Sequence, residues 1–128
     1  MACEARMENI EPFTAHAEFY TDERAYITEL HNTDADDSCS IARARIEPGV
    51  TTQVHKLLDT IERYVILEGT ARVMVGNAAP VEVQALDVVN ISAGTEQSIS
   101  NTGSGDLVFL CICTPRFRQC NYIALDSA

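Results

Sequence analysis

Hydrophobic and polar residues alternate along much of this chain, in short runs separated by turn residues. Alternating runs span residues 25–30, 38–47, 70–75, 80–84, 87–91 and 97–101. Because successive side chains of a strand point to opposite faces, such runs predict half-buried strands. The run at 107–113, LVFLCIC, is apolar on both faces and predicts a strand that is buried on both. No run has a convincing helical period, so the pattern predicts an all-β sandwich or barrel.

The stretch at residues 48–69, PGVTTQVHKLLDTIERYVILEG, contains two further alternating halves joined by a short turn at 58–61. In the first half His55 and Leu57 share a face, and in the second half Glu62 and Tyr64 share a face. We expect the two halves to form a β-hairpin. Such a hairpin would bring His55 and Glu62 together on one inward surface.

This stretch resembles the first motif of the cupin family. Gly49, His55, Glu62 and Gly69 stand at the spacing of that motif, whereas Leu57 stands at the position of the family's second histidine. Residues 86–101, LDVVNISAGTEQSISN, resemble the second motif. There the matching positions are Asp87, Ile91, Ala93, Gly94 and Asn101, while Ser92 replaces a proline and Gln97 replaces a histidine. The resemblance covers roughly residues 38 to 117 and implies a cupin-type double-stranded β-helix, or jelly-roll barrel, with a central pocket.

The resemblance also implies a divalent transition metal such as Fe, Mn, Ni or Zn, held at the positions of His55, Leu57, Glu62 and Gln97. Leucine has no lone pair, and a glutamine amide oxygen is a poor ligand for these ions compared with imidazole. The metal ligands that survive are His55, Glu62 and Gln97, which predict a weak site or none. Without a metal, His55 and Glu62 are either a catalytic acid–base pair or a buried polar network completed by Gln97.

Other side chains are candidates for contact with a bound molecule. Tyr64, Leu57 and Gln97 are expected to line the pocket. Arg43 becomes an anion anchor for a carboxylate substrate if its face of the 38–47 strand points inward. Asn101 is expected to stabilise a turn rather than to touch a ligand. Two functions stay open: an enzyme of the oxygenase, isomerase or lyase type acting on a small organic acid or similar metabolite, or a non-catalytic binding or sensing barrel.

Length and charge narrow the class of protein. At 128 residues the chain is expected to form one domain, with an N-terminal arm at 1–24, a barrel at 25–117 and a C-terminal tail at 118–128. The net charge of −10 argues against binding to nucleic acid, because an acidic surface repels phosphates. No apolar run is long enough for a membrane span, and the first residues lack the features of a secretory signal. Five cysteines without a CxxC pair suggest free thiols and a cytoplasmic location.

We predict a homodimer, because apolar residues gather near both ends of the chain and an open barrel leaves strand edges to be covered. Light scattering at micromolar concentration should give about twice the mass of one chain. A monomer under those conditions would contradict the prediction.

Overall fold

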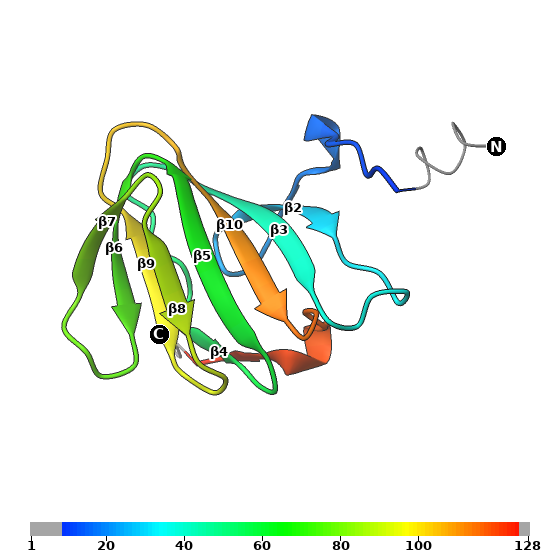
Figure 1. The fold of residues 1–128 in the computed structure, drawn as a ribbon. Helices are drawn as coiled ribbons and strands as arrows, with labels where there is room; N and C mark the ends of the chain where they lie inside the picture. Colours follow the sequence, from blue (N-terminus) through cyan, green and yellow to red (C-terminus); the bar gives the residue numbers. More distant parts are fainter. Residues whose placement is uncertain (1–8, 126–128) are drawn as a thin grey trace.

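Residues 9–125, which the computed structural model describes, form two antiparallel sheets (Figure 1). The six-stranded sheet has the order β1-β2-β3-β10-β5-β8. Its strands are β1 (Phe19–Tyr20), β2 (Tyr26–His31), β3 (Ser40–Ile46), β10 (Leu107–Thr114), β5 (Ile61–Glu68) and β8 (Val88–Ile91). The five-stranded sheet has the order β11-β4-β9-β6-β7. Its strands are β11 (Tyr122–Ala124), β4 (His55–Leu57), β9 (Gln97–Asn101), β6 (Thr70–Val75) and β7 (Val81–Gln84).

The strands predicted from alternation are confirmed. The predicted runs at 70–75 and 97–101 coincide with β6 and β9, and the other five agree with observed strands to within two residues at either end. The short 3-10 helices η1 (Ala15–Ala17) and η2 (Gln119–Asn121) are the helical elements of the described residues. No helix in residues 9–125 is long and apolar enough to cross a membrane.

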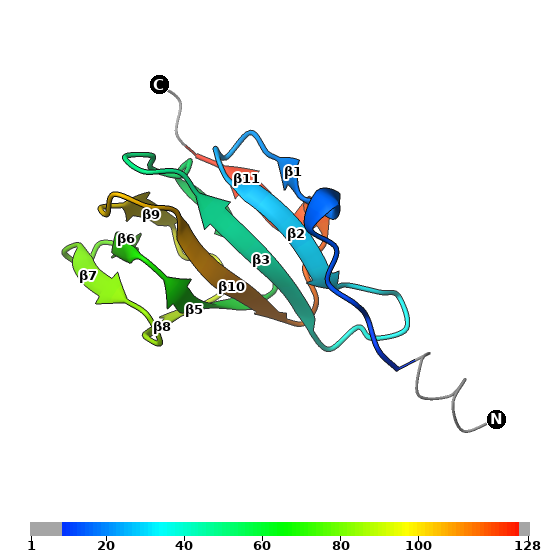
Figure 2. The same ribbon diagram turned by 90° about the horizontal axis from the view of Figure 1, so that it is seen from above.

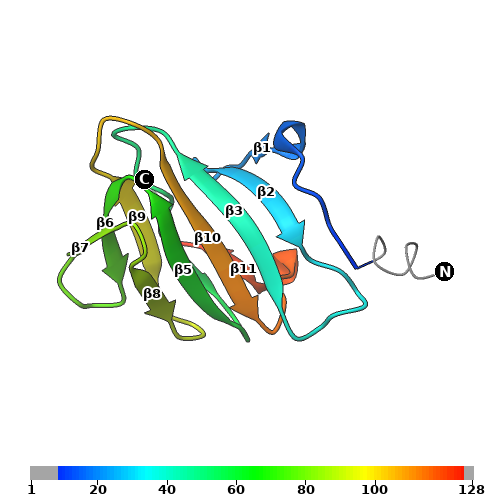
Figure 3. The ribbon, with the colours of Figure 1, turned by 45° about the horizontal axis from the view of Figure 1, so that its top comes forward.

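The predicted hairpin between the two halves of the 48–69 stretch is wrong. β4 pairs with β9 and β11, whereas β5 pairs with β10 and β8, so the two strands belong to different sheets. Figure 1 labels both strands, and Figure 3 shows β5 between β8 and β10. The residues between them cross from one sheet to the other. Asp59 turns the chain with a φ of 65°, the Leu58 N–H donates to the Asn121 carbonyl at 2.9 Å, and the Thr60 hydroxyl donates to the Pro115 carbonyl at 2.5 Å. These bonds tie the crossover to the C-terminal segment instead of closing a hairpin.

The core lies between the sheets, where inward-facing residues of both meet. Its largest fully buried aliphatic side chains are Ile46, Ile66, Ile91, Ile99 and Leu107. Three of them stand at one end of the central strands β3, β5 and β10. Burial of such a side chain contributes roughly 1.5–3 kcal/mol, so this end supplies much of the stability of the fold.

Segments outside the predicted barrel also join the sheets. β1 pairs with β2, and β11 pairs with β4, so the arm and the tail each contribute an edge strand (Figure 2). Glu18 fastens the arm to the outer face of the six-stranded sheet through ion pairs with Arg43 at 3.3 Å and Arg45 at 2.7 Å. Several apolar side chains of the arm stay exposed, namely Ile10, Phe13, Phe19 and Tyr20.

Asn101 closes the end of β9, which confirms the turn-stabilising role expected for it. Its Nδ2 donates to the carbonyls of Ile46 at 2.9 Å and Gly105 at 2.8 Å, and its Oδ1 accepts the Gly103 N–H at 2.9 Å. The side chain is buried. It therefore satisfies three backbone groups, of which the Ile46 carbonyl lies in the buried core.

Asn101→Ala should lower the free energy of unfolding by about 1–3 kcal/mol, because it leaves the buried Ile46 carbonyl without this partner and removes two bonds that hold the turn. Urea denaturation followed by circular dichroism measures this loss. Asn90→Ala, at an exposed position of β8, is the matched control and should change stability by less than about 0.5 kcal/mol. Equal effects of the two substitutions would contradict the role given to Asn101.

Candidate functional site

A cavity of about 570 Å³ lies between the sheets, beside the aliphatic core. The strands that build the core also build the cavity, because their inward faces change in character along their length. On β3 the inward side chains Ser40, Ala42 and Ala44 line the cavity, before Ile46 joins the core. On β5 Glu62 and Tyr64 line the cavity, and Ile66, further along the strand, joins the core. Small and polar residues at this end of the strands leave the space that large aliphatic residues fill at the other.

Glu62 projects from β5 into the cavity wall and is 92% buried, with 8% of its surface exposed. Its Oε1 makes no hydrogen bond within the described structure, and its Oε2 receives a weak one from the Cys113 thiol at 3.9 Å. Burial, with a smaller contribution from the nearby Glu23 carboxyl group, raises the pKa of Glu62 to about 8, although the Gln97 amide and two thiols act in the opposite direction. Glu62 therefore holds a proton at neutral pH.

Tyr64 and Gln97 link the two sheets next to Glu62. The Tyr64 hydroxyl on β5 donates to the Gln97 Oε1 on β9, and both side chains are buried. Tyr64 lines the cavity, whereas Gln97 lies behind the lining residues, and its Nε2 has no hydrogen-bond partner in the described structure. Burial raises the pKa of Tyr64 well above its ordinary value, so its hydroxyl stays a donor.

His55 faces the same cavity from the five-stranded sheet. Its ring Nδ1 donates to the Gln53 backbone carbonyl at 2.8 Å, which leaves Nε2 as the proton acceptor of the neutral ring. The Tyr122 ring stacks on the imidazole with centroids 4.7 Å apart and an interplanar angle of 15°. Leu57, also on β4, is a buried apolar part of the cavity wall. The pattern that put His55, Leu57, Glu62 and Tyr64 on inward faces thus agrees with their positions, although they reach the cavity from two sheets.

Glu23 is a site residue that the sequence analysis missed. It stands in a turn before β2 and lines the cavity, with its Oε2 3.8 Å from His55 Nδ1. Burial raises the pKa of Glu23, while His55 and Arg24 lower it less. The turn is held in place because the Glu23 carbonyl accepts the Gln53 N–H at 3.1 Å. A lone acidic residue in a polar DER segment gives no sequence signal that separates it from a surface turn.

Two predicted site residues, Gln97 and Arg43, are not among the residues that line the cavity, and Arg43 lies furthest from the prediction. Its side chain lies on the outer face of β3, where it contacts Glu18 and stands 5.8 Å from the centre of the Phe13 ring. Its neighbours Ala42 and Ala44 take the inward positions. None of the cavity-lining residues in the described part of the chain is lysine or arginine, whereas the lining includes Asp22, Glu23, Glu29 and Glu62.

The donor set of the cavity does not fit the divalent metal implied by the resemblance. Residues 9–125 contain no group of three or more His, Cys, Asp or Glu side chains placed to hold a metal ion. Gln97 Oε1 already accepts the Tyr64 hydroxyl, and Leu57 offers no lone pair. Of the three metal ligands predicted from the motifs, only His55 and Glu62 remain as suitable ligand types, one imidazole and one carboxyl group. Glu62 as proton donor and His55 as proton acceptor keep the acid–base pair a prediction that needs no metal.

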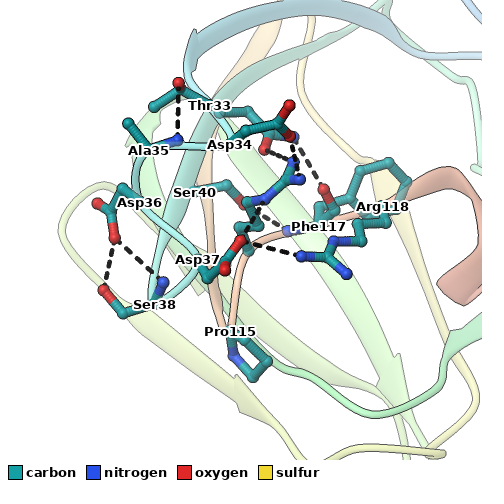
Figure 4. Close-up of polar contacts among 12 residues, drawn as sticks. Thr33, Asp34, Ala35, Asp36, Asp37, Ser38, Ser40, Pro115, Phe117 and Arg118 are labelled. Carbon is teal, nitrogen blue, oxygen red and sulfur yellow. Dashed lines mark hydrogen bonds and ion pairs between the residues drawn. The ribbon is translucent and has the colours of Figure 1, made fainter.

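A polar network fixes part of the cavity wall from outside (Figure 4). Arg116 donates to Asp34 at 2.6 Å, to Asp37 at 3.2 Å and to Asn32 Oδ1 at 3.0 Å, which joins the 32–38 loop to the segment after β10. Asn32 in turn donates to the Phe117 carbonyl at 2.9 Å, and both residues line the cavity. The acidic loop therefore has a structural role, since it positions wall residues.

Comparison with known proteins gives one curated relative and many similar structures. No family model matches the chain. An oxalate-binding protein of Thermotoga maritima is 38% identical over 71 residues, which are 56% of this chain and 58% of that protein. The matched part thus spans little more than half of the relative's length.

Among solved structures, the nucleoside dehydratase Pac13 has a TM-score of 0.73 and 15% identity over 89% of each chain. A Klebsiella pneumoniae protein with a double-stranded β-helix domain has a TM-score of 0.73 and 14% identity, covering 91% of this chain and 97% of that one. The Schizosaccharomyces pombe Cnp3 cupin domain has a TM-score of 0.67 and 17% identity, covering 81% and 73%. At these identities the likeness shows the fold, which is a double-stranded β-helix.

The raised pKa of Glu62 predicts a pH dependence of stability. The carboxyl group ionises near pH 4.5 in the unfolded chain and near pH 8 in the folded protein. Between these values the folded protein binds the extra proton, so this group's contribution to stability is fully present below pH 4.5 and is lost as the pH rises toward 8. Glu62→Gln removes the titration but keeps a neutral side chain of the same shape. Its stability relative to the unsubstituted protein should therefore rise by roughly 2–4 kcal/mol between pH 5 and pH 8.

Urea unfolding at several pH values measures this difference. Glu68→Gln, at an exposed position of the same strand, is the matched control for removal of one carboxyl group, and the pH-dependent rise in stability at position 62 should exceed any change that it produces. If Glu62→Gln also tracked the unsubstituted protein across this range, Glu62 would not be the buried proton carrier described above.

Proposed function

We propose that this chain, which has the cupin fold, binds a small organic molecule in the cavity between its two sheets. The observation that carries the proposal is Glu62, a buried carboxyl side chain that lines the cavity. Burial of an ionisable group costs free energy unless it is partnered, and a polar group of a bound molecule would supply a partner on the cavity side.

The size and the wall of the cavity support this proposal. A volume of about 570 Å³ falls within the range of roughly 300–1,000 Å³ that is typical of small-molecule sites. The wall is mostly apolar and aromatic, with a few polar groups such as Glu62, His55 and Gln53. Binding sites for small molecules share this arrangement, because apolar contact supplies affinity and a few polar groups supply orientation.

The comparisons support the same class of function. The curated relative is described as an oxalate-binding protein, and structures of Streptomyces Pac13 variants contain uridine. Oxalate and uridine differ in charge, size and shape. The two names therefore support binding of a small molecule as a class, and they leave its chemistry to the residues of this cavity.

A thermal-shift screen tests the proposal with a panel of small acids, amines and uncharged metabolites that includes oxalate and uridine. A ligand at ten times its dissociation constant adds about 1.4 kcal/mol to stability, which should raise the melting temperature by several degrees. The screen is run with and without a chelator to test whether binding needs a metal. Because the donor set of the cavity does not fit a divalent metal, the two runs should agree.

Ala42→Phe should abolish the shifts, because the added ring projects from β3 into the cavity. Ala79→Phe, at an exposed loop position, is the matched control and should bind as the unsubstituted protein does. Circular dichroism checks that both variants fold. The proposal fails if no compound in the panel shifts the melting temperature, or if Ala42→Phe binds ligands as tightly as the unsubstituted protein.

A further inference from the structure

We infer that the molecule bound in this cavity is an organic cation, with a positively charged nitrogen group carried on a flat or apolar body. The inference rests on the proposed function, because it names the class of ligand for the same site. Three features of the cavity support it: the charge of its wall, the buried carboxyl group of Glu62, and the concentration of aromatic rings.

The charge of the wall is one-sided. Four carboxyl side chains line the cavity, those of Asp22, Glu23, Glu29 and Glu62, and the described lining contains neither lysine nor arginine. An anion entering this space would lose its hydration and find no opposite charge to replace it. A cation would stabilise the ionised form of these carboxyl groups, and the low dielectric constant of the interior strengthens that attraction.

His55 does not supply a positive charge that offsets these carboxyl groups. It is the one histidine among the described lining residues, and its Nδ1 already faces the Gln53 carbonyl at 2.8 Å and the Glu23 Oε2 at 3.8 Å. A proton on both ring nitrogens would therefore be balanced by the Glu23 carboxylate. No positive charge is left over to hold an anionic ligand.

Glu62 gives the cation a specific partner. Its side chain is 92% buried and lines the cavity, and neighbouring protein atoms cover its Oε1. An ammonium or amidinium ion in the cavity favours the ionised form of this carboxyl group and can donate an N–H to it. Charge-assisted hydrogen bonds of this kind are shorter and stronger than those between neutral groups.

The aromatic side chains of the chain gather around the same space. The sequence contains four phenylalanines and four tyrosines, and six of these residues line the cavity. They are Phe19, Tyr20, Tyr64, Phe109, Phe117 and Tyr122. Aromatic faces attract cations through the ring quadrupole, and they also stack against flat apolar groups. An aromatic wall with several carboxyl groups therefore suits a cation better than a neutral or anionic molecule.

Three ring compounds of nearly the same shape test the inference, namely benzamidinium, benzamide and benzoate. They carry a positive charge, no charge and a negative charge, respectively. Ligand-observed NMR at pH 7 measures their dissociation constants with the full chain. We expect benzamidinium to bind at least about tenfold more tightly than benzamide, and benzoate to bind more weakly than either.

Glu62→Gln separates a charge partner from a general effect on the fold. The substitution should remove most of the preference for benzamidinium over benzamide while leaving benzamide binding within about twofold. Glu68→Gln, at an exposed position of the same strand, should leave both constants unchanged. Loss of binding for all three compounds in Glu62→Gln would point to damage to the cavity and would overturn the assignment of Glu62.

The outcomes also separate this inference from the proposed function. Benzoate or benzamide binding as tightly as benzamidinium would overturn the cation inference while small-molecule binding in the cavity stands. Binding of benzamidinium that persists unchanged in Ala42→Phe would place it on the acidic surface and overturn the inference as well. If none of the three compounds binds at millimolar concentration, the inference fails, and the wider screen decides the proposed function.

Discussion

The structure depends on a change in side-chain size along the inward faces of three central strands, β3, β5 and β10. At one end Ile46, Ile66 and Leu107 fill the space between the sheets and supply the core. At the other end small or polar residues such as Ala42 and Glu62 face the same space and leave it open. Because the strands are continuous, the packed end holds the open end in shape. The cavity is thus preformed by the same hydrogen-bonded ladders that stabilise the barrel.

Much of the fold follows from sequence because alternation with a period of two determines which side chains share a face. That rule identified His55, Glu62 and Tyr64 as inward residues. It could not identify which strands pair, since a turn of four residues between two strands is compatible with a hairpin or with a crossover between sheets. The hairpin was the wrong choice here, because the crossover is stabilised by bonds of Leu58 and Thr60 to a C-terminal segment far away in the sequence.

The other site residues that the sequence did not place correctly have the same explanation, since contacts distant in sequence decide their positions. Glu23 reaches the cavity from an irregular turn, and Tyr122 covers His55 from the last strand, so neither position follows from a repeating pattern. Arg43 does lie on a regular strand, but the pattern alone did not show which face of that strand points inward. Alternation placed it on one face of its strand, but the choice between inside and outside was set by contacts with Glu18 and Phe13 of the arm. Contacts between segments that are distant in sequence decided each of these positions.

Glu62 shows how stability and function oppose each other in this cavity. Burial raises its pKa to about 8, so the free protein bears the cost of holding a carboxyl group away from water. From the five-stranded sheet the amide of Gln97 lowers the pKa of this carboxyl group, and no lysine or arginine of the described residues lines the cavity beside it. A purely structural core would gain stability by replacing Glu62 with a hydrophobic residue, as the other end of β5 does with Ile66. The proposed cation would lower the cost instead, because a positive charge in the cavity stabilises the ionised carboxyl group. The burial of Glu62 beside the cavity is therefore consistent with the proposed ligand.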